Sequence, residues 1–440
     1  MGYMLSRFNI VQKNVSLDTN TSIVFNTLSR QLAVIPTIAL QDLSILSHEE
    51  LLQLKDINIV VEDEQDEIAE LKTHINKKRY SAETLMLTII PTNACNFKCI
   101  YCYQPTRYSY MSEEVFNSIL TWLGKNLRFY KKLNLVWFGG EPLLHKTLVI
   151  TMMKKVKELC KKNKVAMVAS MTTNGYLLDV NTFQELVKSG LIFYQITIDG
   201  NRETHNLQRP HKTKDNSYEV ILNNLIKIKE LHPRFRFEIG IRINVSGKMK
   251  QEDIFQFIDN MKENFSGDKR FVFIWQWVRN WGGDRIEKVE KNSLVKRSVD
   301  CIEFMEYAIK KGLKSPAILT STTGTDACEA FYKSGYVINY DGKVFKCAMC
   351  MEDFHNNCIG YINLNGNMQI DTQKELLWLK EDMIEEKCLS CPLLPICLLS
   401  RCHYSTKIKS TLRCMEYKSL IDSQINSILS NNKFLIIGDK

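Results

Sequence analysis

The segment Cys95–Cys102 constrains this chain more than any other stretch of its sequence. Its cysteines stand at i, i+4 and i+7 (Cys95, Cys99 and Cys102), shortly after an apolar run over 84–91. Thiolates are soft ligands that select iron–sulfur clusters or zinc, and three of them on one short loop can face a common point. A closed tetrahedral site needs four protein ligands. The loop therefore predicts a metal group with one open position for a substrate or cofactor, unless it is a zinc loop or a set of buried cysteines.

The composition is that of a soluble globular protein. With 440 residues, 45% of them apolar and 24% charged, the chain is expected to form two or three domains. Its apolar runs are too short to cross a bilayer, and its first residues do not resemble a signal peptide. Fourteen cysteines without a secretion signal favour thiolate metal ligation over disulfides. We therefore expect a cytoplasmic protein with no membrane partner.

The net charge of +9 is spread along the chain. The densest basic patch, over 154–164, has the spacing of the solvated face of a helix. Nucleic-acid binding usually requires a more concentrated basic surface. We therefore expect no nucleic-acid partner.

From Thr84 onward, apolar strand-like runs alternate with helical patterns. Strands are expected at 84–91, 133–138, 165–172, 193–198, 235–245 and 270–278, and helices at 112–129, 145–162, 179–189, 217–231 and 251–265. This alternation predicts βα units and a parallel sheet, hence the α/β class. The strand runs are apolar and β-branched, as in a sheet that is covered on both faces.

Three polar motifs follow consecutive predicted strands. Val136–Pro142 contains Gly139, Gly140 and Glu141, and glycines let a backbone approach a ligand closely. The next two strands end in 172–175, which includes Asn174, and in 197–200, which includes Thr197 and Asp199. Parallel α/β sheets bind ligands at the carboxyl ends of their strands. These motifs therefore predict a ligand site at one edge of the sheet.

The cysteine loop, with Tyr101 as its aromatic residue, resembles the CxxxCx(aromatic)C motif of the radical SAM superfamily, and Gly139-Gly140-Glu141 resembles its GGE segment. The resemblance implies a partial (β/α)6 TIM-like barrel. It also implies a 4Fe–4S cluster on Cys95, Cys99 and Cys102 that binds S-adenosylmethionine (SAM) and cleaves it to a 5′-deoxyadenosyl radical. The SAM contacts that the resemblance implies are Tyr101, Gly139, Gly140, Glu141, Asn174, Thr197, Asp199 and Arg209.

A second group of cysteines fills the C-terminal part. Cys328 and Cys347 form a CX13GX4C arrangement, and a CX2CX5CX4C run is followed by a last cysteine. Because no histidine is interleaved at zinc-finger spacing, iron–sulfur ligation is favoured over structural zinc. The pattern looks like the SPASM domain, which implies two auxiliary 4Fe–4S clusters: an outer one on Cys388, Cys391, Cys397 and Cys414, and an inner one on Cys328, Cys347 and Cys402.

Two departures from the SPASM pattern affect the inner cluster. Four residues, Leu398–Arg401, precede Cys402 where the family usually has three, and Thr320–Thr323 stand where a fourth ligand is expected. Cys350 or Cys358 could supply that ligand, or one iron could stay open for substrate. The domains that we expect are an N-terminal α+β module at 1–80, a radical SAM core at 81–280, a connector at 281–327 and a SPASM domain at 328–440.

The N-terminal module is expected to contain short strands and two helices. Strands are indicated at 8–11, 22–26, 32–35 and 57–61, with a charged helix over 62–78. Another helix is expected to start after Ser47, because Ser47 and Glu50 have capping-box spacing. Such a module could recognise a leader peptide, or it could be a lid or packing extension.

Radical SAM enzymes with a SPASM domain include sulfatase maturases, which make formylglycine, and maturases of ribosomally made peptides. Sulfatase maturases carry an Asp base directly after the cysteine that corresponds to Cys347, and this chain has Ala348 there. They also begin shortly before the first cluster, whereas 94 residues precede Cys95 here. Both features favour a peptide maturase that installs a thioether or another crosslink.

We expect a precursor peptide and an electron donor such as flavodoxin or ferredoxin as partners. The sequence nominates no catalytic acid or base. A non-enzymatic alternative is a cysteine-rich zinc protein that binds a peptide or RNA, although such a protein would not need Gly139-Gly140-Glu141.

Overall fold

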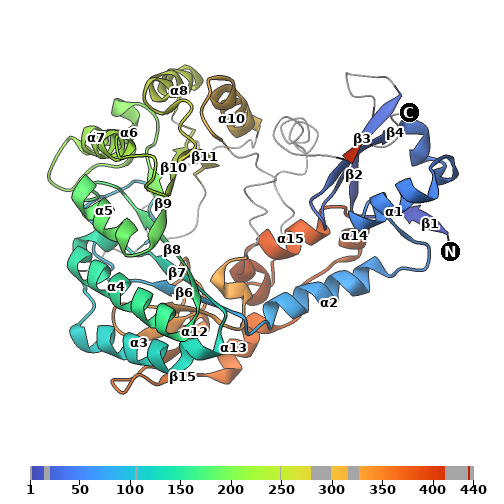
Figure 1. Ribbon diagram of the computed structural model, residues 1–440. Helices are drawn as coiled ribbons and strands as arrows, with labels where there is room; N and C mark the ends of the chain where they lie inside the picture. The colour runs from blue at the N-terminus through green and yellow to red at the C-terminus, as the bar shows by residue number, and fades with distance from the viewer. Residues whose placement is uncertain are drawn as a thin grey trace. The chain divides into compact units, whose positions relative to one another are not determined.

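The computed structural model describes residues 2–13, 20–104, 108–247, 249–278, 299–315, 327–411 and 435–436. The chain forms two compact units, both visible in Figure 1. The core unit comprises Ser81–Pro316 and Tyr332–Leu379. The terminal unit comprises Met1–Tyr80, Ala317–Phe331 and Lys380–Lys440, so it draws on both ends of the sequence.

The core unit is built on a ten-stranded sheet of order β11-β10-β9-β8-β7-β6-β12-β13-β14-β15. Its first six strands in sequence pair in parallel, which confirms the predicted α/β class. They are β6 (Thr84–Ile89), β7 (Lys132–Trp137), β8 (Ala166–Thr173), β9 (Leu191–Thr197), β10 (Glu238–Val245) and β11 (Phe271–Trp277). Each predicted strand is present, with its ends shifted by a few residues.

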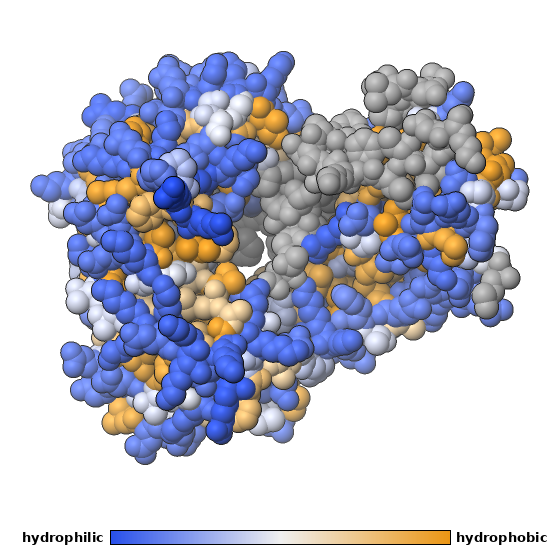
Figure 2. Space-filling view, viewed as in Figure 1, coloured by the Kyte–Doolittle hydropathy of each residue, from blue (hydrophilic) through white to orange (hydrophobic). Residues whose placement is uncertain are grey.

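Helices follow the parallel strands, and several that are neighbours in sequence pack against one another (Figure 1). They are α3 (Glu113–Asn126), α4 (Lys146–Asn163), α5 (Val180–Lys188), α6 (Arg202–Gln208), α7 (Ser217–Lys229), α8 (Gln251–Phe265) and α10 (Val299–Lys310). The side chains of Ser112 and Asp179 accept hydrogen bonds from the first-turn amides of α3 and α5, so both helices start where the sequence provides a cap. The short helix α6 was not predicted. Figure 2 shows mostly hydrophilic residues on the visible surface of these helices, whose apolar residues face inward.

The rest of the sheet comes from a stretch that carried no clear strand signal. β12 (Gly335–Ile338) pairs in parallel with β6, and β13 (Lys343–Phe345), β14 (Cys358–Ile362) and β15 (Met368–Ile370) continue the sheet in antiparallel fashion. The short helices α12 (Phe354–Asn357) and α13 (Thr372–Leu379) accompany them. These strands are too short to show a period, and β12 joins the parallel sheet by pairing with β6, which is distant in sequence.

The terminal unit contains a four-stranded sheet of order β16-β4-β3-β2 and a two-stranded pair, β1 with β5. The bounds are β1 (Tyr3–Leu5), β2 (Asn9–Lys13), β3 (Thr21–Asn26), β4 (Leu32–Pro36), β5 (Val60–Glu62) and β16 (Leu435–Ile436). Helices α1 (His48–Asp56) and α2 (Glu67–Arg79) complete the N-terminal part, and the predicted capping box of Ser47 and Glu50 is confirmed.

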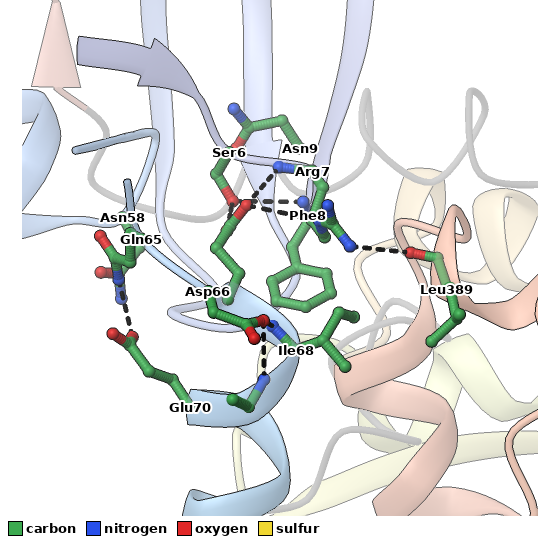
Figure 3. A network of polar contacts seen from close by, with 12 residues as sticks. Ser6, Arg7, Phe8, Asn9, Asn58, Gln65, Asp66, Ile68, Glu70 and Leu389 are labelled. Atoms are coloured by element: carbon green, nitrogen blue, oxygen red, sulfur yellow. Dashed lines mark hydrogen bonds and ion pairs between the residues drawn. The ribbon is translucent and has the colours of Figure 1, made fainter. Parts of the chain in front are cut away.

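Polar contacts join the start of the chain to α2 and to a C-terminal segment (Figure 3). The Ser6 hydroxyl donates to Glu67 Oε1 at 2.5 Å, and the Arg7 amide donates to Glu67 Oε2 at 2.9 Å. The Arg7 guanidinium reaches the carbonyl of Leu389 at 3.3 Å. Leu389 ends α14 (Glu386–Leu389), one of the helices that carry the C-terminal cysteines.

A shared hydrophobic core joins the same two segments. Leu393 and Ile396, at the start of α15 (Leu394–Ser400), pack with side chains of the N-terminal sheet, namely Ile10, Ile23, Phe25 and Leu32. The N-terminal α+β residues and the cysteine-bearing residues of 388–397 therefore fold as parts of one unit.

Several predictions fall outside the described residues. These are most of the connector at 281–327, including Thr320–Thr323, and the predicted ligand Cys414. Across the residues that are described, no helix is both long and apolar enough to span a membrane.

Candidate active site

The cysteine loop leaves the carboxyl end of β6 and is held by the segment that follows α6. The amides of Lys98 and Ile100 donate to the carbonyls of Pro210 and Gln208, at 2.9 and 3.0 Å. Phe97 forms an antiparallel bridge with His211. This pairing brings Arg209, predicted from the resemblance, beside a loop that lies over a hundred positions earlier in the sequence.

The three thiols of this loop influence one another electrostatically. Burial, together with the nearby Cys99, Glu141 and Cys102, raises the pKa of Cys95 to about 12. This repulsion between thiolates is relieved when a metal cation replaces the protons, so the donor set suits an iron–sulfur cluster. In the described part of the chain, no three His, Cys, Asp or Glu side chains already stand as a metal-binding group. The assignment of the cluster to these cysteines therefore stays a prediction.

Gly139 and Gly140 bring the loop after β7 against the cysteine loop. The amides of Gly140 and Glu141 donate to the carbonyls of Thr92 and Ala94 at 3.1 and 2.8 Å. A Cβ atom at Gly139 would lie 2.5 Å from the Thr92 oxygen, and one at Gly140 would lie 2.2 Å from the Ala94 oxygen. Gly139 also has a φ of +131°, which favours glycine. These glycines therefore allow the loop after β7 to lie close against the chain's own cysteine loop.

Glu141 is fully buried and joins two strand ends. Its carboxylate accepts hydrogen bonds from the Leu143 amide at 3.0 Å, the Thr173 hydroxyl at 2.7 Å and the Asn174 amide at 2.7 Å. Burial raises the pKa of Glu141, although these hydrogen bonds act in the opposite direction. The Asn174 side chain then donates to Asn96 of the cysteine loop at 2.7 Å. Glu141 and Asn174 thus lie together at the carboxyl edge of the sheet, as the sequence predicted.

A buried network surrounds the hydroxyl of Tyr101. This hydroxyl donates to Asp199 and accepts from Arg209 Nη1 at 2.8 Å and from Asn244 Nδ2 at 3.1 Å. The Asn244 amide also donates to Asp199 at 2.8 Å. Three predicted residues therefore meet here, whereas Asn244 was not predicted. Thr197 ends β9, opposite Arg242 of β10 in the strand register.

Other features of this edge were not apparent in the sequence. The rings of Tyr176 and His211 stack at 4.5 Å, and Phe97 packs edge-on against both. Asn96 Nδ2, Arg209 Nε and the Ser246 hydroxyl are buried without a hydrogen-bond partner. Buried donors are normally satisfied, so these indicate that a polar ligand completes the site. They fit the carboxylate and hydroxyl groups of SAM.

Cys347 and Cys350 lie in the core unit, on the loop after β13. The Asn357 side chain clamps this loop, since its oxygen accepts from the Cys347 amide at 2.9 Å and its nitrogen donates to the carbonyls of Cys347 and Cys350 at 2.8 and 2.9 Å. The Tyr103 hydroxyl contacts Met349 Sδ at 2.7 Å. Burial raises the pKa of Tyr103, and the thiols of Cys102, Cys347 and Cys350 raise it further. Tyr103 therefore lies close to both cysteine loops of the core unit.

The other predicted cysteines belong to the terminal unit. Cys388, Cys391 and Cys397 are half-buried on and around α14 and α15, whereas Cys328 and Cys402 are exposed. The amide of Cys391 donates to the carbonyl of Cys388 at 3.1 Å, which forms a tight turn between these two predicted ligands. The assignment of these cysteines to two clusters stays a prediction.

Residues 89–259 match the family described as the Radical SAM superfamily. The matched residues contain the Cys95–Cys102 loop, the Gly139-Gly140-Glu141 turn and the Tyr101 network. This part of the chain is therefore a radical SAM domain. The family implies a 4Fe–4S cluster and SAM as cofactors.

Curated relatives cover only part of the chain. It is 28% identical over 177 residues to Fe-coproporphyrin III synthase of Methanosarcina barkeri, which is 39% of each chain. It is 32% identical over 128 residues to a probable GTP 3′,8-cyclase of Methanocaldococcus jannaschii, which is 28% of this chain and 39% of the relative. The chain thus spans about two fifths of the length of these relatives.

Solved structures match more of the chain. The structure of anSMEcpe with bound AdoMet covers 79% of this chain and 100% of its own, with a TM-score of 0.55 and 18% identity. The structure of anSMEcpe with bound AdoMet and the Cp18Cys peptide covers 79% of this chain and 99% of its own, with a TM-score of 0.52 and 18% identity. At this identity, the likeness shows that the fold is shared.

Proposed function

We propose that this chain is a cytoplasmic radical SAM peptide maturase, which abstracts hydrogen from a ribosomally made precursor peptide and installs a thioether or other crosslink. The observation that carries the radical step is the meeting of Cys95–Cys102, Gly139-Gly140-Glu141 and the Tyr101–Asp199–Arg209 network at one edge of the sheet. When bound, the cluster and SAM supply the 5′-deoxyadenosyl radical. The chain itself supplies position and the exclusion of water.

The buried donors define how SAM is held in this proposal. Arg209 Nε, Asn96 Nδ2 and the Ser246 hydroxyl are buried and lack hydrogen-bond partners in the protein. They suit the carboxylate and ribose hydroxyls of SAM, while Glu141 suits its ammonium group because a carboxylate has lone pairs beyond the three bonds described. The stacked rings of Tyr176 and His211 pack against Phe97 of the cysteine loop, and in this proposal they help to exclude water from it.

Ala348 favours a peptide crosslink over formylglycine formation. Ala348 is 9% exposed and packs among the buried side chains of Ile90, Val337, Phe345 and Cys358. A carboxylate at this position would lie among apolar groups at a high desolvation cost. The loop after Cys347 therefore provides no base of the kind that sulfatase maturases carry there. Formylglycine formation is the second candidate, supported by the likeness of the fold to anSMEcpe.

The N-terminal residues 1–80 are assigned to recognition of the precursor peptide, and a flavodoxin or ferredoxin is the proposed electron donor. The bound peptide in an anSMEcpe structure supports a peptide partner. Cys388, Cys391, Cys397 and Cys414 are assigned to an outer auxiliary cluster. Cys328, Cys347, Cys402 and Cys350 are assigned to an inner one.

The radical step is tested with protein that is purified and reconstituted without oxygen. Cys99→Ala should abolish 5′-deoxyadenosine formation, because it removes a cluster ligand. Cys160→Ala is the matched control, since Cys160 is a buried cysteine on α4, outside the loop. Equal 5′-deoxyadenosine formation in the wild type and Cys99→Ala would contradict the assignment.

Metal content tests the auxiliary clusters and the zinc alternative together. Three cubanes predict about twelve irons, falling to about eight when Cys95, Cys99 and Cys102 are all replaced by Ala. About four irons that are all lost in the triple variant would remove the auxiliary clusters from the proposal. Colourless protein with bound zinc would favour the peptide- or RNA-binding alternative.

The product separates the two candidate reactions. Incubation with a short peptide encoded beside this gene should give a product that has lost a pair of hydrogen atoms and no longer reacts with a thiol reagent at the crosslinked cysteine. A product that reacts with a hydrazide carries an aldehyde, which would favour formylglycine formation.

A further inference from the structure

Arg242 interrupts a mostly apolar strand of the core unit. Successive side chains of a strand point to opposite faces of the sheet. Along β10, the three isoleucines are fully buried on one face, whereas Arg242 and Asn244 lie on the other. Thr197 of β9 is in register with Arg242, and Gln276 of β11 is in register with Asn244. Arg242 is half-buried, so this face of the sheet carries a partly buried cation among polar neighbours.

The guanidinium of Arg242 is fixed at one end only. Its Nε donates to Asn244 Oδ1 at 2.9 Å. Within the described ranges of the chain, no acceptor bonds its Nη1 or Nη2, and no carboxylate forms an ion pair with it. Arg270 of the same unit differs, because all three of its nitrogens are bonded, to Asp268 and to two backbone carbonyls. The Nη1–Nη2 edge of Arg242 is therefore oriented but unused, and such an edge can hold a carboxylate through two parallel hydrogen bonds.

The charge of Arg242 is not fully compensated by its surroundings. Burial lowers the pKa of the Arg242 guanidinium, and the like charge of Arg209 acts in the same direction. Tyr101, Asp199 and Tyr103 act in the opposite direction without outweighing burial. A cation in such a place destabilises the fold unless an anion accompanies it. Arg242 therefore does not serve the stability of the strand, and a bound anion would offset its cost.

The anchor of Arg242 connects it to the cysteine loop. Asn244, which holds Arg242 Nε, also donates from Nδ2 to the Tyr101 hydroxyl at 3.1 Å. Arg242 thus lies two hydrogen bonds away from the loop that carries the proposed cluster. Tyr103, which directly follows Cys102, is also close enough to influence Arg242 electrostatically. A molecule bound at the Nη1–Nη2 edge would therefore lie beside the site assigned to SAM.

We propose that Arg242 binds a carboxylate of the precursor peptide and thereby positions the residue from which hydrogen is abstracted. This inference rests on the proposed function. SAM has a single carboxylate, which is assigned above to the buried donors that include Arg209 Nε. The carboxylate at Arg242 then comes from the peptide, either from an Asp or Glu side chain or from its C-terminus. Arg242 is a specificity-determining residue, because a peptide without this carboxylate would leave the guanidinium unpaired.

The test uses reconstituted protein and the short peptide encoded beside this gene, with analogues in which one Asp or Glu, or the C-terminal carboxylate, is replaced by its amide. Arg242→Gln should lower kcat/KM for the unmodified peptide by about 10- to 100-fold, the loss expected for a charged hydrogen bond. One amide analogue should show the same loss with the wild type and no further loss with Arg242→Gln. Arg242→Lys keeps the charge without the planar fork and should recover part of the loss.

The control is Arg236→Gln, which removes the same charge from an exposed site before β10 and should change kcat/KM much less. Additive losses for every analogue in Arg242→Gln, or an effect no larger than that of Arg236→Gln, would overturn the inference. A rise in the dissociation constant of SAM as large as the loss for the peptide would also overturn it, because it would assign Arg242 to the carboxylate of SAM.

Two further outcomes are decisive. If Arg242→Gln does not fold, Arg242→Lys with the same analogues takes its place. A wild-type protein that does not bind the peptide would overturn the inference, whereas 5′-deoxyadenosine formed by that protein would show that the radical SAM proposal still holds.

Discussion

The core unit and the terminal unit bury charge in opposite ways. In the core unit, Asp199 is buried with Tyr101, Asn244 and Arg209, and the four side chains form one hydrogen-bonded network. In the terminal unit, Asp382 is buried with three cations that it cannot neutralise. The carboxylate of the first site faces one cation, whereas that of the second faces three.

The two aspartates show this difference in their pKa values. Burial raises the pKa of Asp199, and the single charge of Arg209 does not compensate fully. Burial also acts to raise the pKa of Asp382, but Arg79, Lys407 and Arg401 outweigh it and hold the pKa well below its usual value. The three cations beside Asp382 lower its pKa, whereas the one cation beside Asp199 does not offset burial, so burial alone does not predict the charge state of a site.

The largest expected effect is from breaking the core network at Arg209. Arg209→Met removes the cation that pairs with Tyr101 and Asp199, and also a buried donor assigned to SAM. We expect 5′-deoxyadenosine formation to fall by about 100-fold or more, since loss of a buried charged partner costs roughly 3–5 kcal/mol. The measurement is single-turnover SAM cleavage at saturating reductant. Arg202→Met, at an exposed ion pair with Glu219, is the control, and equal rates in both variants would refute the assignment.

A smaller effect is expected from weakening the shared core of the terminal unit. Ile396 is 1% exposed and packs with the N-terminal sheet. Ile396→Ala should destabilise this unit by about 2–4 kcal/mol, because it leaves a cavity. Hydrogen exchange measured by mass spectrometry should then rise in both β3 and α15 and stay unchanged in β8. Leu389→Ala, at a side chain that is 39% exposed, is the control. Faster exchange in α15 alone would show that the two segments unfold separately.

The smallest effect expected is the acid sensitivity of Asp382. The pKa of Asp382 is lower in the folded than in the unfolded chain, so ionised Asp382 stabilises the folded state. This stabilisation is complete when the pH is above the pKa of the unfolded chain, and it is lost as the pH falls below about 4. Asp199 has the opposite sign, because its raised pKa favours the folded core unit on acidification. When the pH is lowered from about 5 to about 3, protection against hydrogen exchange should therefore fall in α15 before it falls in β9. Simultaneous loss of protection in both elements would remove this contrast.

Local patterns were enough to predict the elements of the core unit. Alternating apolar runs and caps such as Ser112 and Asp179 set the strands and helices, because these signals act within a few residues. The strands β12–β15 were missed, since they are only three to five residues long and show no clear period. The same limit hid Asn244, Tyr176 and His211, whose importance depends on what the fold brings beside them.

The sequence by itself determined the radical SAM assignment and the alternation of strands and helices in the core unit, because the cysteine loop, the Gly139-Gly140-Glu141 turn and the apolar periods are local signals. Only the tertiary structure decided that residues 1–80 and 380–440 belong to one unit, and that Arg79, Asp382, Arg401 and Lys407 meet in its interior. These residues are separated by up to several hundred positions, and the attraction between their charges becomes strong only when packing removes them from water. No local sequence pattern predicts that these four side chains meet.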